Sequence, residues 1–216
     1  MHVQGQAGPP SNPRGMPTTD DEIREKYLER AIRELNVFAR EVQACGDCPR
    51  GALMPVLGSG HPQAEILLLK YFARPSEVEE GVAFYGRAGN ALMKSLKRLT
   101  IDPLAVYGTL CVKCPVPDPA MADPACVGRL VEELAIVAPK IVVVMGEDAL
   151  ATVNELDLPL RRGLEPVMGE IQPLTPSIEA LYVPNIDDAL DDESAKRKFW
   201  AAFRVLGEWW DQLPPY

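Results

Sequence analysis

The five cysteines are the residues of this chain whose type and spacing most directly suggest chemistry. Cys45 and Cys48 form a Cys-x-x-Cys pair in "ACGDCPRG", and "VYGTLCVKCPVPDPAMADPACVG" holds Cys111, Cys114 and Cys126. Four thiolates in two groups can complete a tetrahedral zinc site or hold an iron–sulfur cluster, and the spacing does not choose between these. Cys111 fits another role, that of a small buried hydrophobic residue, because it lies inside an apolar run typical of a strand.

The composition is that of a globular protein. Of its 216 residues, 47% are hydrophobic and 25% charged, and no apolar run reaches the roughly 18 residues of a membrane helix. The start of the chain lacks the apolar core of a secretory signal, so we expect a flexible tail at 1–19, one domain at 20–216, and a cytoplasmic location without membrane contact. In a reducing compartment, an odd number of cysteines favours metal ligation over disulfides.

The net charge of −9 weighs against tight binding to nucleic acid, which depends on Lys and Arg. The charge is segregated, however, because "GRAGNALMKSLKR", "LRRG" and "AKRK" are locally basic. If the chain binds DNA, we therefore expect weak, salt-sensitive binding that favours single-stranded or distorted DNA. The end "GEWWDQLPPY", with Trp209, Trp210 and Tyr216, would suit a protein partner if exposed; ordinary packing of the last helix is the alternative, and the better one for Trp210.

The hydrophobic pattern predicts alternating strands and helices around these cysteines. Continuous apolar runs predict strands at 64–72, 104–112, 140–146 and 179–186, the kind that is buried on both faces. Helical spacing predicts a long first helix with an apolar stripe, and further helices, at 18–44, 89–99, 124–138, 147–156 and 193–213. This alternation indicates a doubly wound α/β fold.

Several blocks of the chain, read in order, resemble one known family. They are "CGDCPRG", "VLGSGHPQAEILLL", "FYGRAG", "VYGTLCVKCPVP", "APKIVVVMGEDAL", "PLRRG" and "KRKFW". Together they are similar to the iron–sulfur uracil-DNA glycosylases, family 4 of that superfamily. The resemblance implies a three-layer α/β/α sandwich with a four-stranded, mostly parallel sheet, and a 4Fe-4S cluster held by Cys45, Cys48, Cys114 and Cys126, with zinc as the alternative. The last two ligands are closer together than is usual in that family.

The residues that excise uracil in that family are mostly replaced here. The Gly-Glu-Ala-Pro-Gly loop after the first strand aligns with residues 70–74, "KYFAR", which lack its glycines and its acid. The Asn that reads the uracil edge aligns with Leu110, which offers no donor or acceptor. The His-Pro-Ser motif aligns with Asn185, Ile186 and Asp187, so the imidazole that stabilises the leaving base is missing.

One element of the base pocket is retained. Phe84 matches the ring that stacks on the flipped base, although a Phe at this position can equally be a core residue. Base binding is thus predicted at Phe84 and Leu110, and the aligned positions for catalysis are Tyr71, Asn185 and Asp187. Charge runs such as that around Asp187 usually form a solvated face rather than a catalytic site.

Two functional hypotheses follow. In the first, the chain is a glycosylase-like module that lacks standard uracil excision and acts by binding or regulation in DNA repair or replication. In the second, it is a glycosylase or another nucleic-acid enzyme whose rebuilt pocket, around Tyr71, Asn185 and Asp187, handles a different base. A third interpretation, a zinc protein of related fold without a link to DNA, depends on the metal.

Overall fold

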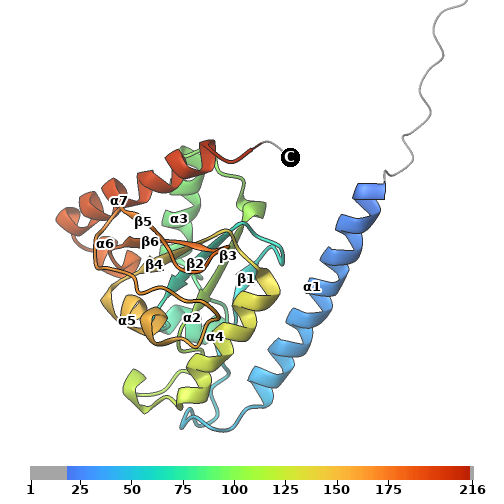
Figure 1. The fold of residues 1–216 in the computed structure, drawn as a ribbon. Coiled ribbons are helices and arrows are strands. Elements are labelled where there is room, and N and C mark those ends of the chain that lie inside the picture. Colours follow the sequence, from blue (N-terminus) through green and yellow to red (C-terminus); the bar gives the residue numbers. More distant parts are fainter. Residues whose placement is uncertain (1–18, 215–216) are drawn as a thin grey trace, which may run out of the picture.

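The computed structural model describes residues 19–214, with side chains from residue 21. It contains one six-stranded sheet in the order β1-β3-β2-β4-β6-β5 (Figure 1). The four central strands are parallel and correspond to the four predicted apolar runs: β2 (Ile66–Lys70), β3 (Val106–Leu110), β4 (Ile141–Met145) and β6 (Glu179–Val183). The sheet has two more strands than predicted, because β1 (Ser59–Gly60) and β5 (Ile171–Pro173) pair antiparallel at its edges. These edge strands are too short and too exposed to leave an apolar signal.

Helices cover both faces of the sheet, which confirms the predicted three-layer α/β/α class. On one face α3 (Arg87–Arg98) and α7 (Glu193–Asp211) share a core with the alternate residues of β2, β4 and β6. On the other face α4 (Pro124–Val137) and α5 (Glu147–Glu155) pack on the intervening residues. Figure 1 shows α7 and α5 on opposite sides of the sheet. The continuous apolar runs arise because each strand is buried on both faces.

Short helical segments follow the carboxyl ends of two strands, and others lie in two further loops. They are α2 (Pro75–Glu80), α6 (Ile186–Ala189), and 3₁₀ turns at Pro103–Ala105 and Pro119–Met121. Sequence patterns did not predict them, since three to six residues carry no helical period. The segments α2 and α6 begin shortly after β2 and β6, so they surround the edge where parallel α/β sheets bind ligands.

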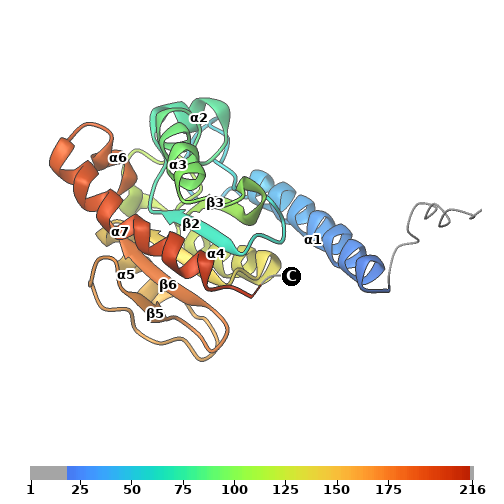
Figure 2. The same cartoon turned by 90° about the horizontal axis from the view of Figure 1, so that it is seen from above.

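The first helix, α1 (Thr19–Ala44), packs on α4 only with its second half (Figures 1 and 2). Phe38 and Val42 are buried, whereas Ile23 and Tyr27, on the same predicted apolar stripe, are 45% and 58% exposed. The predicted apolar stripe is therefore not buried near the start of the helix, which extends past the sheet and its covering helices, whereas Ala31 at mid-helix is buried. The predicted tail lies outside the described residues, apart from Thr19, which begins α1. Within the described part, no helix has the length and hydropathy needed to cross a bilayer.

The last helix packs with its aromatic residues inward. Phe199 and Phe203 stack with ring centroids 5.1 Å apart, and Trp209 is 8% exposed, with its indole N–H donating to Glu179. Trp210 is half-buried against the same core, as the packing alternative predicted. The two tryptophans therefore do not form an exposed aromatic surface, and Tyr216 lies outside the described residues.

Candidate functional site

Three of the four predicted metal ligands converge. The sulfur atoms of Cys48, Cys114 and Cys126 lie within 4.8 Å of one another, and all three residues are buried. They come from three separate segments: the loop after α1, the segment after β3, and the first turn of α4. Such a buried group of thiols can hold a metal ion or a metal cluster.

The start of α4 positions the cysteines. Asp123 caps this helix by accepting a hydrogen bond from the backbone N–H of Ala125 at 2.8 Å, and Pro124 occupies the first turn. The backbone N–H of Asp123 donates to the Cys48 sulfur at 3.3 Å, which would stabilise a thiolate there. Burial raises the pKa of the Cys48 and Cys114 thiols, so a metal must displace their protons when it binds.

The fourth predicted ligand, Cys45, is not part of the group. It lies just after α1, and its half-buried thiol donates to a carboxylate oxygen of Asp47 at 3.1 Å. The guanidinium of Arg50 holds this loop by donating to the carbonyl oxygens of Gln43 at 2.9 Å and of Cys45 at 2.7 Å. Cys45 therefore lies three residues from a member of the group without joining it in this conformation.

The fifth cysteine is a buried residue directly after β3. Cys111 has no exposed surface and packs among the residues between the sheet, α4 and α5. Burial raises the pKa of its thiol to about 12. It is not one of the three grouped thiols, in agreement with the expectation of a small buried hydrophobic residue.

A buried ion pair lies next to the cysteine group. Lys113 and Glu133 are 0% exposed, and the Lys113 ammonium lies 2.7 Å from the Glu133 carboxylate. The ammonium also donates to the carbonyl oxygen of Leu110 at 2.9 Å and to the hydroxyl of Thr109 at 3.2 Å. Tyr107 and Thr109 each donate a hydroxyl hydrogen bond of 2.7 Å to Glu133. The pair ties the segment that carries Cys114 to the helix that carries Cys126.

A second buried cluster lies at the carboxyl end of β2. The ammonium of Lys70, the last residue of that strand, lies 2.6 Å from Glu77 and 2.9 Å from Asp187, and Lys70 is 1% exposed. Glu77 has no exposed surface and also accepts hydrogen bonds from the backbone N–H groups of Arg74, at 2.6 Å, and Phe84. Asp187 is 9% exposed, and its Oδ1 has no hydrogen-bond partner among the described residues. Asp187 is thus not on a solvated face, contrary to the expectation for its charge run.

The two residues predicted to bind a base lie beside this cluster. Phe84 is 8% exposed and adopts a left-handed backbone with φ of 60°. Its ring lies against β3, where a Cβ on Gly108 would come within 2.6 Å of it, and the Lys70 ammonium lies 5.4 Å from the ring centroid. Leu110 is fully buried in the same core. Both side chains therefore have core positions in this conformation, while a role in base binding stays a prediction.

Of the three positions aligned with catalytic residues, two share a cavity. Tyr71 and Asn185 line a cavity of about 400 Å³ at the carboxyl ends of β2, β4 and β6, together with Glu147, Asp148 and Asp188. Burial raises the pKa of Tyr71, with nearby Asp148 adding to the effect. Asn185 also caps α6 by accepting from the backbone N–H of Asp187 at 3.1 Å. Asp187 itself points to Lys70 rather than lining this cavity.

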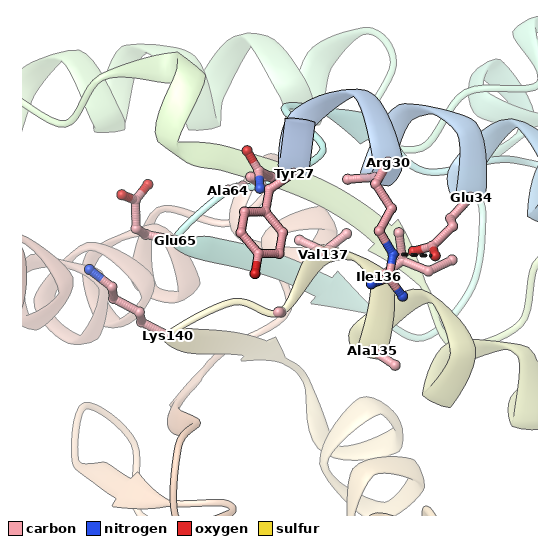
Figure 3. A pocket seen from close by; sticks show the side chains of 12 residues that line it. Tyr27, Arg30, Glu34, Ala64, Glu65, Ala135, Ile136, Val137 and Lys140 are labelled. Atoms are coloured by element: carbon pink, nitrogen blue, oxygen red, sulfur yellow. Dashed lines mark hydrogen bonds and ion pairs between the residues drawn. The ribbon is translucent and has the colours of Figure 1, made fainter. Parts of the chain in front are cut away.

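Another cavity, of about 380 Å³, lies between α1 and the residues that precede β2 and β4. Figure 3 shows Tyr27 pointing from α1 toward the segment that carries Lys140, and the ion pair between Arg30 and Glu34, whose atoms are 2.7 Å apart. No cysteine lines it, and it lies at the amino ends of the strands, away from the cysteine group and the Lys70 cluster.

The two buried clusters were not predicted, although two local signals pointed to them. The stretch "RPSEVEE" has Pro at the first position of α2 and Glu77 at the third, a helix-start pattern that turns this carboxylate inward. Glu133 lies on the buried stripe of α4, with Cys126, Leu130, Leu134 and Val137. A carboxylate on such a stripe requires a buried partner.

The comparison with known families gives one match. Residues 57–204, more than half of the chain, match the model described as "Uracil DNA glycosylase superfamily". The matched range contains the Lys70 and Lys113 clusters, Cys114 and Cys126. It begins at residue 57, so Cys45 and Cys48 lie outside it.

Proposed function

Since the chain belongs to the uracil-DNA glycosylase superfamily, we propose that it is an iron–sulfur member resembling family 4 that does not excise uracil. In this proposal it acts as a nucleic-acid-binding or regulatory module in DNA repair or replication. The observation that carries the proposal is the Lys70 cluster. Its buried ion pairs occupy the region where the aligned positions place the base pocket of that family.

The cluster opposes base binding. For a base to stack on the face of Phe84 that Lys70 approaches, the ammonium would have to leave and expose two carboxylates. Breaking a buried ion pair by removing one partner costs about 3–5 kcal/mol. At the neighbouring position, Leu110 cannot form the hydrogen bonds by which an amide selects uracil.

The charges of the cluster oppose the chemistry as well. Excision leaves negative charge on the departing base, which an enzyme stabilises with donors or cations. Here Asp187 replaces part of the His-Pro-Ser motif, and Lys70, the nearby cation, is already paired with two carboxylates. A carboxylate at this place would repel an anionic leaving group.

An excision assay tests this proposal. The purified protein is incubated with oligonucleotides that carry uracil, hypoxanthine or an alkylated base, beside a uracil-excising member of the superfamily as a positive control. We expect no release of any base from the wild-type chain. Release that disappears in Asp187→Ala or Asn185→Ala would contradict the proposal.

One observation favours the second candidate function, excision of a different base. The unpartnered Oδ1 of Asp187 is a buried acceptor, and its chain neighbours Asn185 and Asp188 line the cavity at the strand ends. A ligand that donates a hydrogen bond could satisfy this oxygen. The same assay separates the two functions, because this candidate requires one base of the panel to be released.

The proposed cofactor is a 4Fe-4S cluster, with zinc as the alternative. Cys48, Cys114 and Cys126 would supply three ligands, and Cys45 would become the fourth if its thiol turned away from Asp47. Thiolates suit either metal centre, and such a centre would fasten the loop after α1 to α4.

The metal assignment is tested by anaerobic purification followed by iron, sulfide and zinc analysis. We expect iron and sulfide in the wild-type protein and their loss in Cys114→Ser and Cys126→Ser. Cys111→Ser is the matched control and should retain the metal. Zinc without sulfide would contradict the iron–sulfur proposal, and full iron content in Cys45→Ser would exclude this residue as the fourth ligand.

A further inference from the structure

A basic groove separates α3 from α7. It has a volume of about 540 Å³, and its charged lining residues are Arg87, Lys94 and Arg98 from α3 and Lys196 from α7, with no carboxylate among the lining side chains. The whole chain carries a net charge of −9, so this concentration of cations is a local exception. A surface with this charge attracts anions.

Two of these cations, Lys94 and Arg98, have no acidic partner to neutralise them. Within residues 19–214, no carboxylate lies within 4.0 Å of the charged group of Lys94 or Arg98, and α3 contains no acidic residue. The guanidinium of Arg98 stacks over the ring of Trp200, 4.8 Å from its centre. This stacking holds a planar cation in the groove without consuming its hydrogen-bond donors.

The other two cations, Arg87 and Lys196, are paired but exposed. Arg87 lies 2.8 Å from Asp191, and Lys196 lies 3.1 Å from Glu193, with all four side chains more than 60% exposed. Exposed pairs of this kind contribute little to stability. Both cations can therefore exchange their carboxylate for another anion at small cost.

The arrangement along α3 matches a linear polyanion. Arg87, Lys94 and Arg98 are seven and four residues apart, so they follow one face of the helix over about 16 Å. Along the axis of a duplex one strand carries a phosphate about every 3.4 Å, and the phosphates of an extended single strand lie further apart, so a stripe of this length spans several of them. A compact ligand with one phosphate would use only part of the stripe.

We propose that the groove between α3 and α7 binds the phosphate backbone of single-stranded nucleic acid. A positively charged groove with an aromatic side chain in its lining, here Trp200, is typical of sites that bind a single strand. The proposal rests on the nucleic-acid association in the proposed function and names the surface that provides it. The groove begins at Ile186 and Ala189, beside the Lys70 cluster, and follows α3 away from the carboxyl ends of the strands. A strand could be held there whether or not any base is excised.

The test uses fluorescence anisotropy with a labelled oligothymidylate and the metal-loaded protein. Lys94→Ala/Arg98→Ala should weaken binding at least tenfold and reduce the slope of log affinity against log salt by about 1.4, the value for two lost phosphate contacts on a single strand. Arg33→Ala/Arg40→Ala is the matched control, because it removes two exposed cations from α1 and should leave affinity unchanged. Equal melting temperatures of the variants establish that folding is preserved.

Four results would overturn the proposal. Undiminished binding by Lys94→Ala/Arg98→Ala would exclude the groove while leaving nucleic-acid association intact. Equal losses in the two double variants would show that only overall charge matters. Equal affinity for a duplex or for polyglutamate would exclude a single-strand site. If the wild-type protein binds no oligonucleotide even at low salt, the nucleic-acid part of the proposed function fails together with the groove.

Discussion

Lys70 and Lys113 are both fully buried at the ends of neighbouring strands, but their surroundings differ. The Lys113 ammonium faces one carboxylate, and hydroxyl groups from Tyr107 and Thr109 complete the bonding of Glu133. The Lys70 ammonium lies between two carboxylates, and one oxygen of Asp187 has no partner among the described residues. One cluster is balanced in charge and fully bonded, whereas the other has an excess carboxylate.

This difference predicts that the two clusters tolerate substitution to different degrees. A buried charge with a single counter-ion is intolerant of substitution, since removing either partner leaves the other unpaired. A cluster with a spare carboxylate can lose that group and keep its lysine paired. We therefore expect the Lys113 pair to support the fold and the cysteine group, and the Lys70 cluster to tolerate change at Asp187.

Lys113→Met should have the largest effect. It leaves Glu133 buried without a cation, which lowers the free energy of unfolding by about 3–5 kcal/mol. Because the pair ties the Cys114 segment to α4, the variant should also retain less metal. Urea unfolding and metal analysis measure the two effects, and Lys113→Met/Glu133→Leu is the control that should recover part of the stability. Unchanged stability in the single variant would contradict the structural role.

Glu133→Gln should cost somewhat less, roughly 1.5–3 kcal/mol, the range for hydrogen bonds that involve a charged group. The amide keeps the shape of the side chain and can still accept from Tyr107, but Lys113 loses its counter-ion. Denaturant unfolding measures the change. A loss of unfolding free energy below about 1 kcal/mol, the value expected for Asp187→Asn in the other cluster, would contradict the difference between the two clusters.

Thr109→Val should cost about 1–2 kcal/mol, because it removes one buried hydroxyl while leaving the ion pair in place. Thr109 donates to Glu133 and accepts from Lys113, so both partners lose a bond but neither loses its charge partner. Unfolding in urea gives the value. Additivity with Lys113→Met in a double-mutant cycle would argue against a connected network.

Asp187→Asn should have the smallest effect, less than about 1 kcal/mol, since Glu77 remains to pair with Lys70 and an amide oxygen can still accept a hydrogen bond. The amide N–H₂ would take the place of the unpartnered oxygen. Thermal and urea unfolding check the result. A loss near 3 kcal/mol would mean that both carboxylates are needed to hold the lysine.

Sequence patterns predicted the elements of this fold better than its buried charges. The run "AEILLLKYF" identified β2 because strands buried on both faces are continuously apolar, but the partners of Lys70 lie 7 and 117 residues away. The start pattern of α2 indicates that Glu77 turns inward, but the pairing of Lys70 with Asp187 depends on the topology of the sheet. The edge strands β1 and β5 escaped prediction because two or three residues carry no periodic signal.

The cysteine prediction shows the same limit. Spacing identified a group of ligands, and three of them meet in the structure. The Cys45 thiol instead bonds to Asp47, a local contact that sequence spacing does not predict. Aligned positions predicted the loss of uracil-binding groups, but not that Lys70 would pair with Glu77 and Asp187.

The partial docking of α1 implies a gradient of backbone dynamics along one helix. Residues 21–27 are all exposed, so their amide hydrogens should exchange with deuterium through fraying of the helix start. Phe38 and Val42, further along, are buried near the loop that carries Cys48. Amides there should open only when α1 detaches from α4, so their exchange rate would report how firmly the cysteine loop is fastened.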